Sequence, residues 1–204
     1  MMFFARKEKR LFTTRTRSGL VAAAVSALLF GGAAVAQQPP PQVMEMMKAQ
    51  MSLMTPELQQ RVKALSPQTK MELAKIYTKH TRRSDTLTLR QVMHEVLADY
   101  QSIMAGIVTE NAEQAADSAR RLANHRLPRG GLLPYMKLED VSDEKLAVLV
   151  PFNDSVEGNA LRLAEAADKG DMALASRYMS DIANGCVACH QVFRGTPGIS
   201  ARLR

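Results

Sequence analysis

The chain of 204 residues contains only two cysteines, Cys186 and Cys189, and neither a second cysteine pair nor a His-x3-His spacing accompanies them. These absences argue against a structural zinc site built on the two cysteines, because such a site needs four ligands. No segment alternates apolar and polar residues over the length of a strand, which argues against β-structure. No carboxylate pair or Ser/His/Asp set indicates a hydrolase.

The first 36 residues have a basic start, an apolar stretch from about Gly19 to Val35, and Ala34-Val35-Ala36 before Gln37. This order is typical of a secretory signal peptide. An uncleaved membrane anchor is the alternative, since the apolar stretch is close to the minimum that spans a bilayer. The small residues and the A-x-A exit favour cleavage. We therefore expect a signal peptide over 1–36, a periplasmic mature chain, and no stable membrane insertion after its removal.

Removal of residues 1–36 changes the charge of the chain. It leaves 21 basic and 19 acidic residues, so that the formal net charge falls from +7 to +2. The high isoelectric point therefore indicates targeting, and no nucleic-acid partner is expected. Basic residues gathered between Arg61 and Arg90 can steer an acidic protein partner or can simply form a solvated helix surface.

The composition and the periodic regions predict an all-α fold. From Leu89 a first helix has apolar residues in steps of 4-3-4-3-4, as in the seam of a bundle helix; these are Leu89, Met93, Val96, Tyr100, Ile103 and Ile107. A second, alanine-striped helix covers 111–125, where small residues allow close approach. A third follows Ser142 and is kinked or delayed by Pro151, and a fourth covers 171–194. We expect an antiparallel four-helix bundle over 86–204, ending in a tail.

Residues 37–85 are predicted to form a Met-rich helical extension. Thr55 and Ser66 each offer a hydroxyl N-cap followed by proline, so residues 44–80 predict three short helices. The first has four methionines on one face, namely Met44, Met47, Met51 and Met54. Soft thioethers can hold Cu(I), which would make the chain a copper-handling protein, whereas an apolar face that packs on the bundle or docks a redox partner is the commoner use.

The sequence Cys186-Val187-Ala188-Cys189-His190 falls late in the fourth predicted helix. Because residues three and four apart are neighbours on a helix face, the two thiols and the imidazole converge on one flat object. This geometry suits haem c, in which Cys186 and Cys189 bond to the porphyrin and His190 ligates the iron. One motif implies one covalent haem. Arg194 lies on the same side, where it can contact a propionate or form an exposed helix end.

Other uses of the two cysteines fit less well. A thiol–disulfide oxidoreductase would place the pair in a βαβ setting at a helix N-terminus, and it remains the enzymatic alternative. A structural disulfide across three residues closes too small a loop to stabilise much. The export signal favours haem attachment, and we expect no enzymatic activity.

The sequence resembles the class II c-type cytochromes, which include cytochrome c-prime and its low-spin relatives. The shared features are "EGNALRLAEAADKGD" leading into "GCVACHQVFR", and the earlier "LRQVMHEVLADYQSIMAGI", within about residues 87–194. The resemblance implies a four-helix bundle with haem held near the last helix, and it allows a homodimer. The extension 37–85, Pro151 and the long second loop depart from the family pattern.

In low-spin members of this family a methionine of the first bundle helix, just after an arginine, is the second axial ligand. Met93 follows Arg90 and corresponds to that ligand. His/Met ligation raises the reduction potential and leaves no open position, which suits electron transfer between redox proteins. If Met93 is an ordinary core methionine, the open iron would instead make the chain a five-coordinate cytochrome c-prime that binds NO or CO.

Other side chains are less suited to be the second ligand. His94 points about 100° away from Met93 around the helix, and Met104 lies about 16 Å further along its axis. His80 and His125 are predicted to be surface or helix-end residues.

Overall fold

The computed structural model describes residues 41–194, which lie in one compact unit. The predicted signal peptide 1–36 and the predicted tail after Arg194 lie outside the described residues. Within 41–194 the chain is helical, and its β-type pairing is limited to an isolated bridge between Arg83 and Leu127. The predicted all-α fold class is confirmed.

Three short helices form the extension, as predicted: α1 (Pro41–Ser52), α2 (Pro56–Ala64) and α3 (Pro67–Lys79). The Thr55 side chain accepts a hydrogen bond from the Leu58 N–H at the start of α2, and the Ser66 side chain accepts one from the Thr69 N–H at the start of α3. Each cap is followed by proline, whose missing N–H costs nothing in the first helical turn. The sequence signals therefore determine where α2 and α3 begin.

The extension shares a hydrophobic core with the loop that follows α5. The extension contributes Met54, Leu58, Val62, Leu65, Leu73 and Tyr77, and residues 127–149 contribute the remainder, including Leu127, Leu133 and Met136. Of the methionine face of α1, Met51 packs against this core, whereas Met44 is 54 % exposed. Packing against this core therefore explains the methionines at the C-terminal end of that face, Met51 and Met54.

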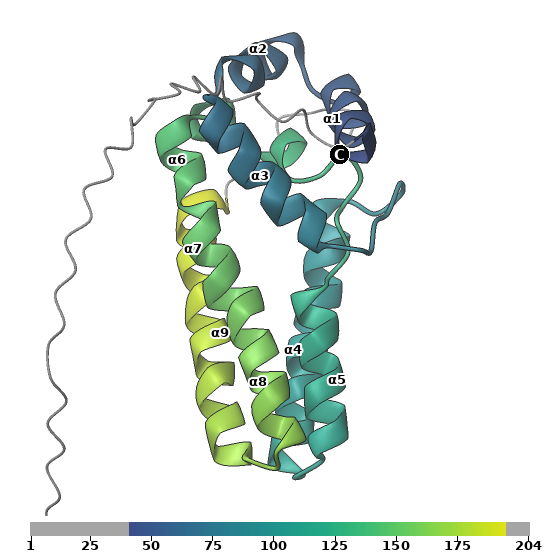
Figure 1. Ribbon diagram of the computed structural model, residues 1–204, viewed down its shortest axis with the longest axis vertical. Coiled ribbons are helices and arrows are strands. Elements are labelled where there is room, and N and C mark those ends of the chain that lie inside the picture. Colours follow the sequence, from purple (N-terminus) through teal and green to yellow (C-terminus); the bar gives the residue numbers. More distant parts are fainter. Residues whose placement is uncertain (1–40, 195–204) are drawn as a thin grey trace, which may run out of the picture. The chain divides into compact units, whose positions relative to one another are not determined.

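Four helical segments make up the bundle: α4 (Leu89–Val108), α5 (Ala112–Ala123), a segmented third helix that ends in α8 (Asn159–Asp168), and α9 (Met172–Phe193). Figure 1 shows neighbouring helices running in opposite directions. Helix α5 packs against α4 on one side and α8 on the other, while α9 packs mainly on α8 and less extensively on α4. Their core includes the predicted alanine stripe, with Ala115, Ala116, Ala119 and Leu122 buried.

The third helix is divided into segments. After the 3-10 turns η1 (Leu133–Tyr135) and η2 (Leu138–Asp140) come α6 (Asp143–Ala147), α7 (Leu149–Asn153), the π-helical turn η3 (Asp154–Gly158) and then α8. The third helix begins at Asp143, capped by Ser142 as predicted, so its start is not delayed. Pro151 lies in the first turn of α7, just after the interruption between α6 and α7, where its missing N–H is tolerated. The wide turn of η3 is supported by Asn159, whose side-chain amide donates to the Ser155 carbonyl at 2.9 Å.

The boundary between the extension and the bundle is not marked by a separate core. The core between the extension and residues 127–149 crosses the predicted division into an extension, 37–85, and a bundle, 86–204, and that division stays a prediction. In the described part of the chain, none of the helices combines the length and the apolar character needed to cross a membrane.

Small residues let α4 and α5 approach very closely. A Cβ atom added to Gly106 would lie 2.6 Å from the Ala115 backbone nitrogen and 2.9 Å from its Cα. These contacts involve backbone, which cannot move aside as a flexible side chain can. Gly106 therefore fixes the distance between the two helices.

We predict that Gly106→Ala destabilises the protein by about 1–2 kcal/mol. Overpacking of this kind typically costs about 1–3 kcal/mol, and the better helix propensity of alanine returns only about 1 kcal/mol. Urea denaturation followed by circular dichroism measures the change. The exposed neighbour provides a control, since Ala105→Gln should stay within about 0.5 kcal/mol of the parent chain. A Gly106→Ala protein at least as stable as the parent would contradict the close approach.

Candidate functional site

The Cys186–His190 motif lies in the last two full turns of α9, a helix of 22 residues. The helix begins where the sequence predicts: Gly170 adopts a positive φ of 74°, and the Asp171 side chain accepts a hydrogen bond from the Leu174 N–H at 2.9 Å. Such a long, well-capped helix is a rigid support. It presents the two cysteines and the histidine on consecutive turns.

The two thiols are free and partly shielded from solvent, whereas His190 is exposed. Cys186 packs against the bundle core together with Tyr178 and the buried Ile182, as the predicted helix face requires. The motif therefore lies at a border, with one cysteine directed toward the core and the imidazole directed toward solvent.

The environment of the thiols disfavours their ionised form. Burial raises the pKa of Cys186, and burial followed by the charge of Cys186 raises the pKa of Cys189. The motif also lies near the C-terminus of α9, where the helix dipole repels negative charge. A redox-active cysteine pair requires the opposite conditions, namely a lowered thiol pKa and a helix N-terminus.

Helix α4 faces the motif through Tyr100. The Tyr100 hydroxyl donates to the Met179 carbonyl at 3.3 Å, and burial followed by the nearby Cys186 raises the pKa of the tyrosine. Because α4 and α9 are antiparallel, residues before Tyr100 lie level with residues after Met179. Met93, two turns before Tyr100, is therefore level with the segment of α9 that holds the motif.

The position of Met93 within α4 differs from the predicted seam. The fully buried residue in this turn is Val92, while Met93 is half-buried and belongs to neither buried cluster of the described residues. Whether Met93 ligates iron or is an ordinary core methionine stays a prediction. The competing side chains lie outside: His94 is exposed, and Met104 is 43 % exposed.

Arg194 is the C-terminal cap residue of α9, and its side chain is exposed. Its backbone N–H donates to the His190 carbonyl at 2.9 Å. The side chain therefore lies at an exposed helix end, and its contact with a haem propionate stays a prediction.

The residues of the motif fit a covalently attached haem. Both thiols are free for thioether bonds, they lie on adjacent turns of one helix, and the imidazole that would ligate iron is accessible. Cys186 borders an apolar core, which supplies the low-polarity contact that a porphyrin face requires.

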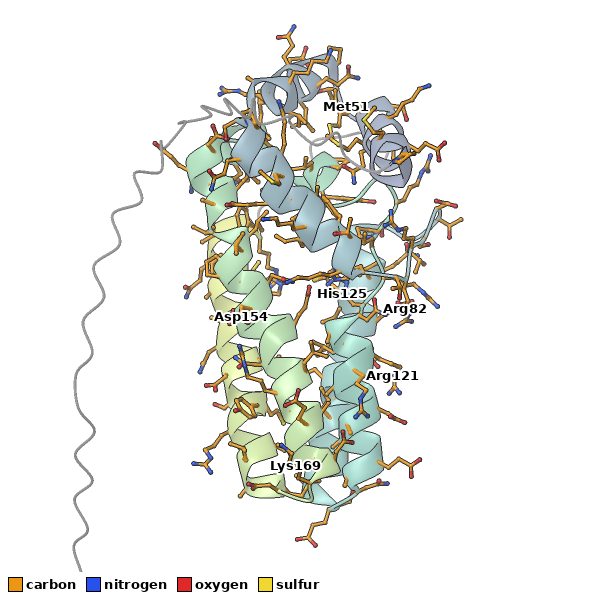
Figure 2. The ribbon with its side chains drawn as sticks, in the orientation of Figure 1. Met51, Arg82, Arg121, His125, Asp154 and Lys169 are labelled. Atoms are coloured by element: carbon orange, nitrogen blue, oxygen red, sulfur yellow. The ribbon has the colours of Figure 1, made fainter. Side chains whose placement is uncertain are left out.

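A second group of chemically active side chains comes from elements other than α9. His80 follows α3, His125 follows α5, and Glu157 belongs to η3 (Figure 2 labels His125, which lies between the α4–α5 pair and the helix that carries Asp154). The Glu157 Oε1 atom lies 3.2 Å from His80 Nε2 and 3.4 Å from His125 Nε2. The imidazole ring centroids are 4.6 Å apart. We call these three residues the His–His–Glu cluster.

Every member of the His–His–Glu cluster is oriented by a further contact. His80 Nδ1 is 3.1 Å from the Ile76 carbonyl, and His125 Nδ1 is 2.8 Å from the Arg126 carbonyl. A carbonyl oxygen only accepts hydrogen bonds, so both Nδ1 atoms must donate. Each Nε2 atom is therefore the nitrogen that faces Glu157.

The electrostatics of the cluster favour a carboxylate combined with positive charge. Burial alone would raise the pKa of Glu157, but the contacts with His125 and His80 outweigh it and lower the pKa to about 2. Burial likewise opposes protonation of His80, but Glu157 outweighs burial and raises the pKa of the imidazole. The Asn153 side-chain amide donates to the other carboxylate oxygen of Glu157.

Of the two positions predicted for His80, surface or helix end, the structure shows the helix end, and the side chain there is only 2 % exposed. His125, just after the C-cap of α5, is partly buried. Glu157 carries no sequence signal as a site residue. The three residues come from distant parts of the chain and form no motif, so only the folded structure brings them together.

We predict that Cys186 reacts slowly with alkylating reagents at neutral pH. In a Cys189→Ala chain made without haem attachment, the alkylation rate should rise with pH to a midpoint above that of an ordinary thiol, because only the thiolate reacts and burial raises the pKa of Cys186. Iodoacetamide kinetics followed by mass spectrometry measure the profile. A rate that is already maximal below pH 7 would instead indicate an activated redox cysteine.

Comparison with known proteins assigns no family or function to this chain. The chain matches no protein-family model, no curated protein and no solved structure. The assignment of a function therefore depends on the motif in α9 and on the residues around it.

Proposed function

We propose that the chain is a periplasmic mono-haem c-type cytochrome of the class II kind, which carries electrons between redox proteins. The observation that carries the proposal is the placement of the complete Cys186–His190 motif in the last turns of a long bundle helix, with both cysteines free. The predicted export signal agrees with it, because haem is attached to such motifs outside the cytoplasm.

Each residue of the motif would have a defined role. Cys186 and Cys189 would form the thioether bonds, and the backbone of α9 would hold them one turn apart. His190 would supply the first axial nitrogen, and its exposure leaves it free to turn toward the iron. When bound, haem supplies a one-electron iron couple, whose potential the axial ligands and the surrounding polarity adjust.

Met93 is the proposed second ligand. It lies on α4, which packs against α9, at the level of the motif, and it is half-buried. A thioether in this position would close the second axial side, which suits electron transfer, and would raise the reduction potential. No acid–base residue is needed for such a function, and the partners would be other redox proteins.

The proposal competes with a thiol–disulfide oxidoreductase that uses the same cysteines. The raised pKa values of both thiols and their place near a helix C-terminus disfavour that chemistry. The same cysteines cannot serve both functions at once, since thioether bonds to haem consume both sulfur atoms.

We predict that the chain, produced in a host that attaches haem, retains one haem after denaturation. Mass spectrometry of the unfolded protein should show the added mass of a single haem, because thioether bonds survive denaturation. The Cys186→Ala/Cys189→Ala chain should lose it entirely. A colourless parent protein whose two thiols still react with an alkylating reagent would end the proposal.

We predict that Met93→Ala converts a low-spin haem spectrum into a high-spin one and abolishes the weak far-red thioether-to-iron band of the oxidised protein. The loss of the sulfur ligand opens the sixth position and should lower the reduction potential. Visible spectroscopy and redox titration measure both changes.

Met104→Ala is the matched control, because it removes an exposed methionine from the same helix. Its spectrum should be that of the parent. If the parent itself is high-spin and binds CO, the protein is a five-coordinate gas-binding cytochrome, and Met93 is not a ligand.

A further inference from the structure

The His–His–Glu cluster brings together three atoms that all carry lone pairs when the histidines are neutral. Both Nδ1 atoms donate to backbone carbonyls, so the two Nε2 atoms face the Glu157 carboxylate as acceptors. Such an arrangement is repulsive unless positive charge lies between the atoms. Either protons or a cation can supply that charge.

The geometry at His80 distinguishes between the two. Its Nε2 atom is fully buried and has no hydrogen-bond partner, although Glu157 Oε1 is only 3.2 Å away. The oxygen is therefore close but does not lie where an N–H bond would point. Two ligands of one cation have this relation, since the cation and not the second ligand occupies the lone-pair direction.

The structure assigns a divalent metal site, most suitable for Zn²⁺, to His80 Nε2, His125 Nε2 and Glu157 Oε1. The site goes beyond the proposed electron transfer and does not depend on it. All three ligand atoms lie within 4.8 Å of one another.

The distances suit a tetrahedral ion. Ligands bound at about 2.0–2.1 Å with tetrahedral angles lie about 3.3–3.4 Å apart, and the carboxylate oxygen is 3.2 and 3.4 Å from the two nitrogens. Two imidazoles and one carboxylate are a ligand set that zinc accepts, with water as the fourth ligand. Among residues 41–194, no fourth His, Cys, Asp or Glu joins the group.

The hydrogen bonds that the three ligand side chains make to other groups are those of a preformed metal site. Metal-binding histidines usually donate the other ring N–H to a carbonyl or carboxylate, which fixes the ring. Both histidines do so here. The Asn153 side-chain amide donates a hydrogen bond to Oε2 of Glu157, which leaves Oε1 as the oxygen that is available to a metal ion.

The backbone segments that carry the two histidines are also tied together. The Asn124 side chain accepts a hydrogen bond from the Thr81 N–H at 3.0 Å and donates to the Thr81 hydroxyl at 2.8 Å. Thr81 follows His80 directly, and Asn124 precedes His125. Much of the entropy of bringing these two ligands together is therefore lost on folding and not on metal binding.

The site would join three parts of the fold. His80 ends the extension, His125 follows the second bundle helix, and Glu157 belongs to the third. A metal ion bound there would fasten the extension to the bundle. The burial of His80 suits such a structural role.

We predict that the metal-stripped full chain binds one Zn²⁺ in calorimetric titration with ZnCl₂, and that zinc raises its melting temperature. Glu157→Gln should weaken binding at least about 100-fold, more than is usual for the loss of an outer contact, and Asn153→Ala about 10-fold. In the Glu157→Gln chain, zinc should no longer raise the melting temperature.

His94→Gln is the matched control, because it removes an exposed histidine outside the cluster; its zinc affinity should stay within about twofold of the parent. Circular dichroism of each variant without zinc shows whether it folds. Anomalous diffraction at the zinc edge from crystals of the parent chain tests the site without any substitution.

An anomalous peak between the three side chains supports the site. A chain that binds no zinc, binding that is lost with His94 or His190 instead of Glu157, or a peak elsewhere would overturn it. In the first of these cases, the cluster is an ion pair of the Glu157 carboxylate with His80 and holds no metal. None of these results affects haem attachment, which is measured separately.

Discussion

The close contact of small residues along α5 is the constraint on which the arrangement of the bundle depends. Alanines on this helix face α4 on one side and α8 on the other, and Gly106 lets the α4 backbone approach Ala115 without an intervening side chain. Because such surfaces have no flexible side chains, they allow little adjustment of distance. The direction of α5 is thereby fixed, and with it the start of the segment that follows Asn124.

That segment connects the bundle to the extension. Leu127 pairs through its backbone with Arg82 and Ser84, and Leu127 and Leu133 enter the core that the extension forms. The pairing brings the end of α3 beside the end of α5. Two histidines that are distant in sequence thus become neighbours because of helix packing elsewhere, and the cluster is a product of the whole fold.

The sequence predicts well those features that depend on a few adjacent residues. Thr55, Ser66, Gly170 and Asp171 mark helix ends because capping is local chemistry, and each lies at the expected boundary. The Cys186–His190 motif is equally local, since a single helix suffices to arrange it. Its haem remains a proposal, but the position of the motif in the fold follows from the sequence alone.

Features that depend on distant segments could not be predicted. His80 has the surroundings of an exposed helix end in the sequence, and only the tertiary structure buries it. The π-helical turn that holds Glu157 has no sequence signature comparable to a cap. The spacing of apolar residues from Leu89 also places Met93 in the seam of the bundle, whereas the fully buried residue is Val92. An apolar stripe specifies a face of α4 but not which of two adjacent residues points inward.

The wide turn η3 also sets the rotational phase between two hydrophobic cores. Upstream of it, Leu149 packs with the extension, and downstream Ala160 and Leu163 pack inside the bundle. Loss of any single residue from 154–158 would rotate one half of this helix against the other by about 100°. Chains that preserve both cores should therefore conserve the length of this stretch more strictly than the identity of its amino acids.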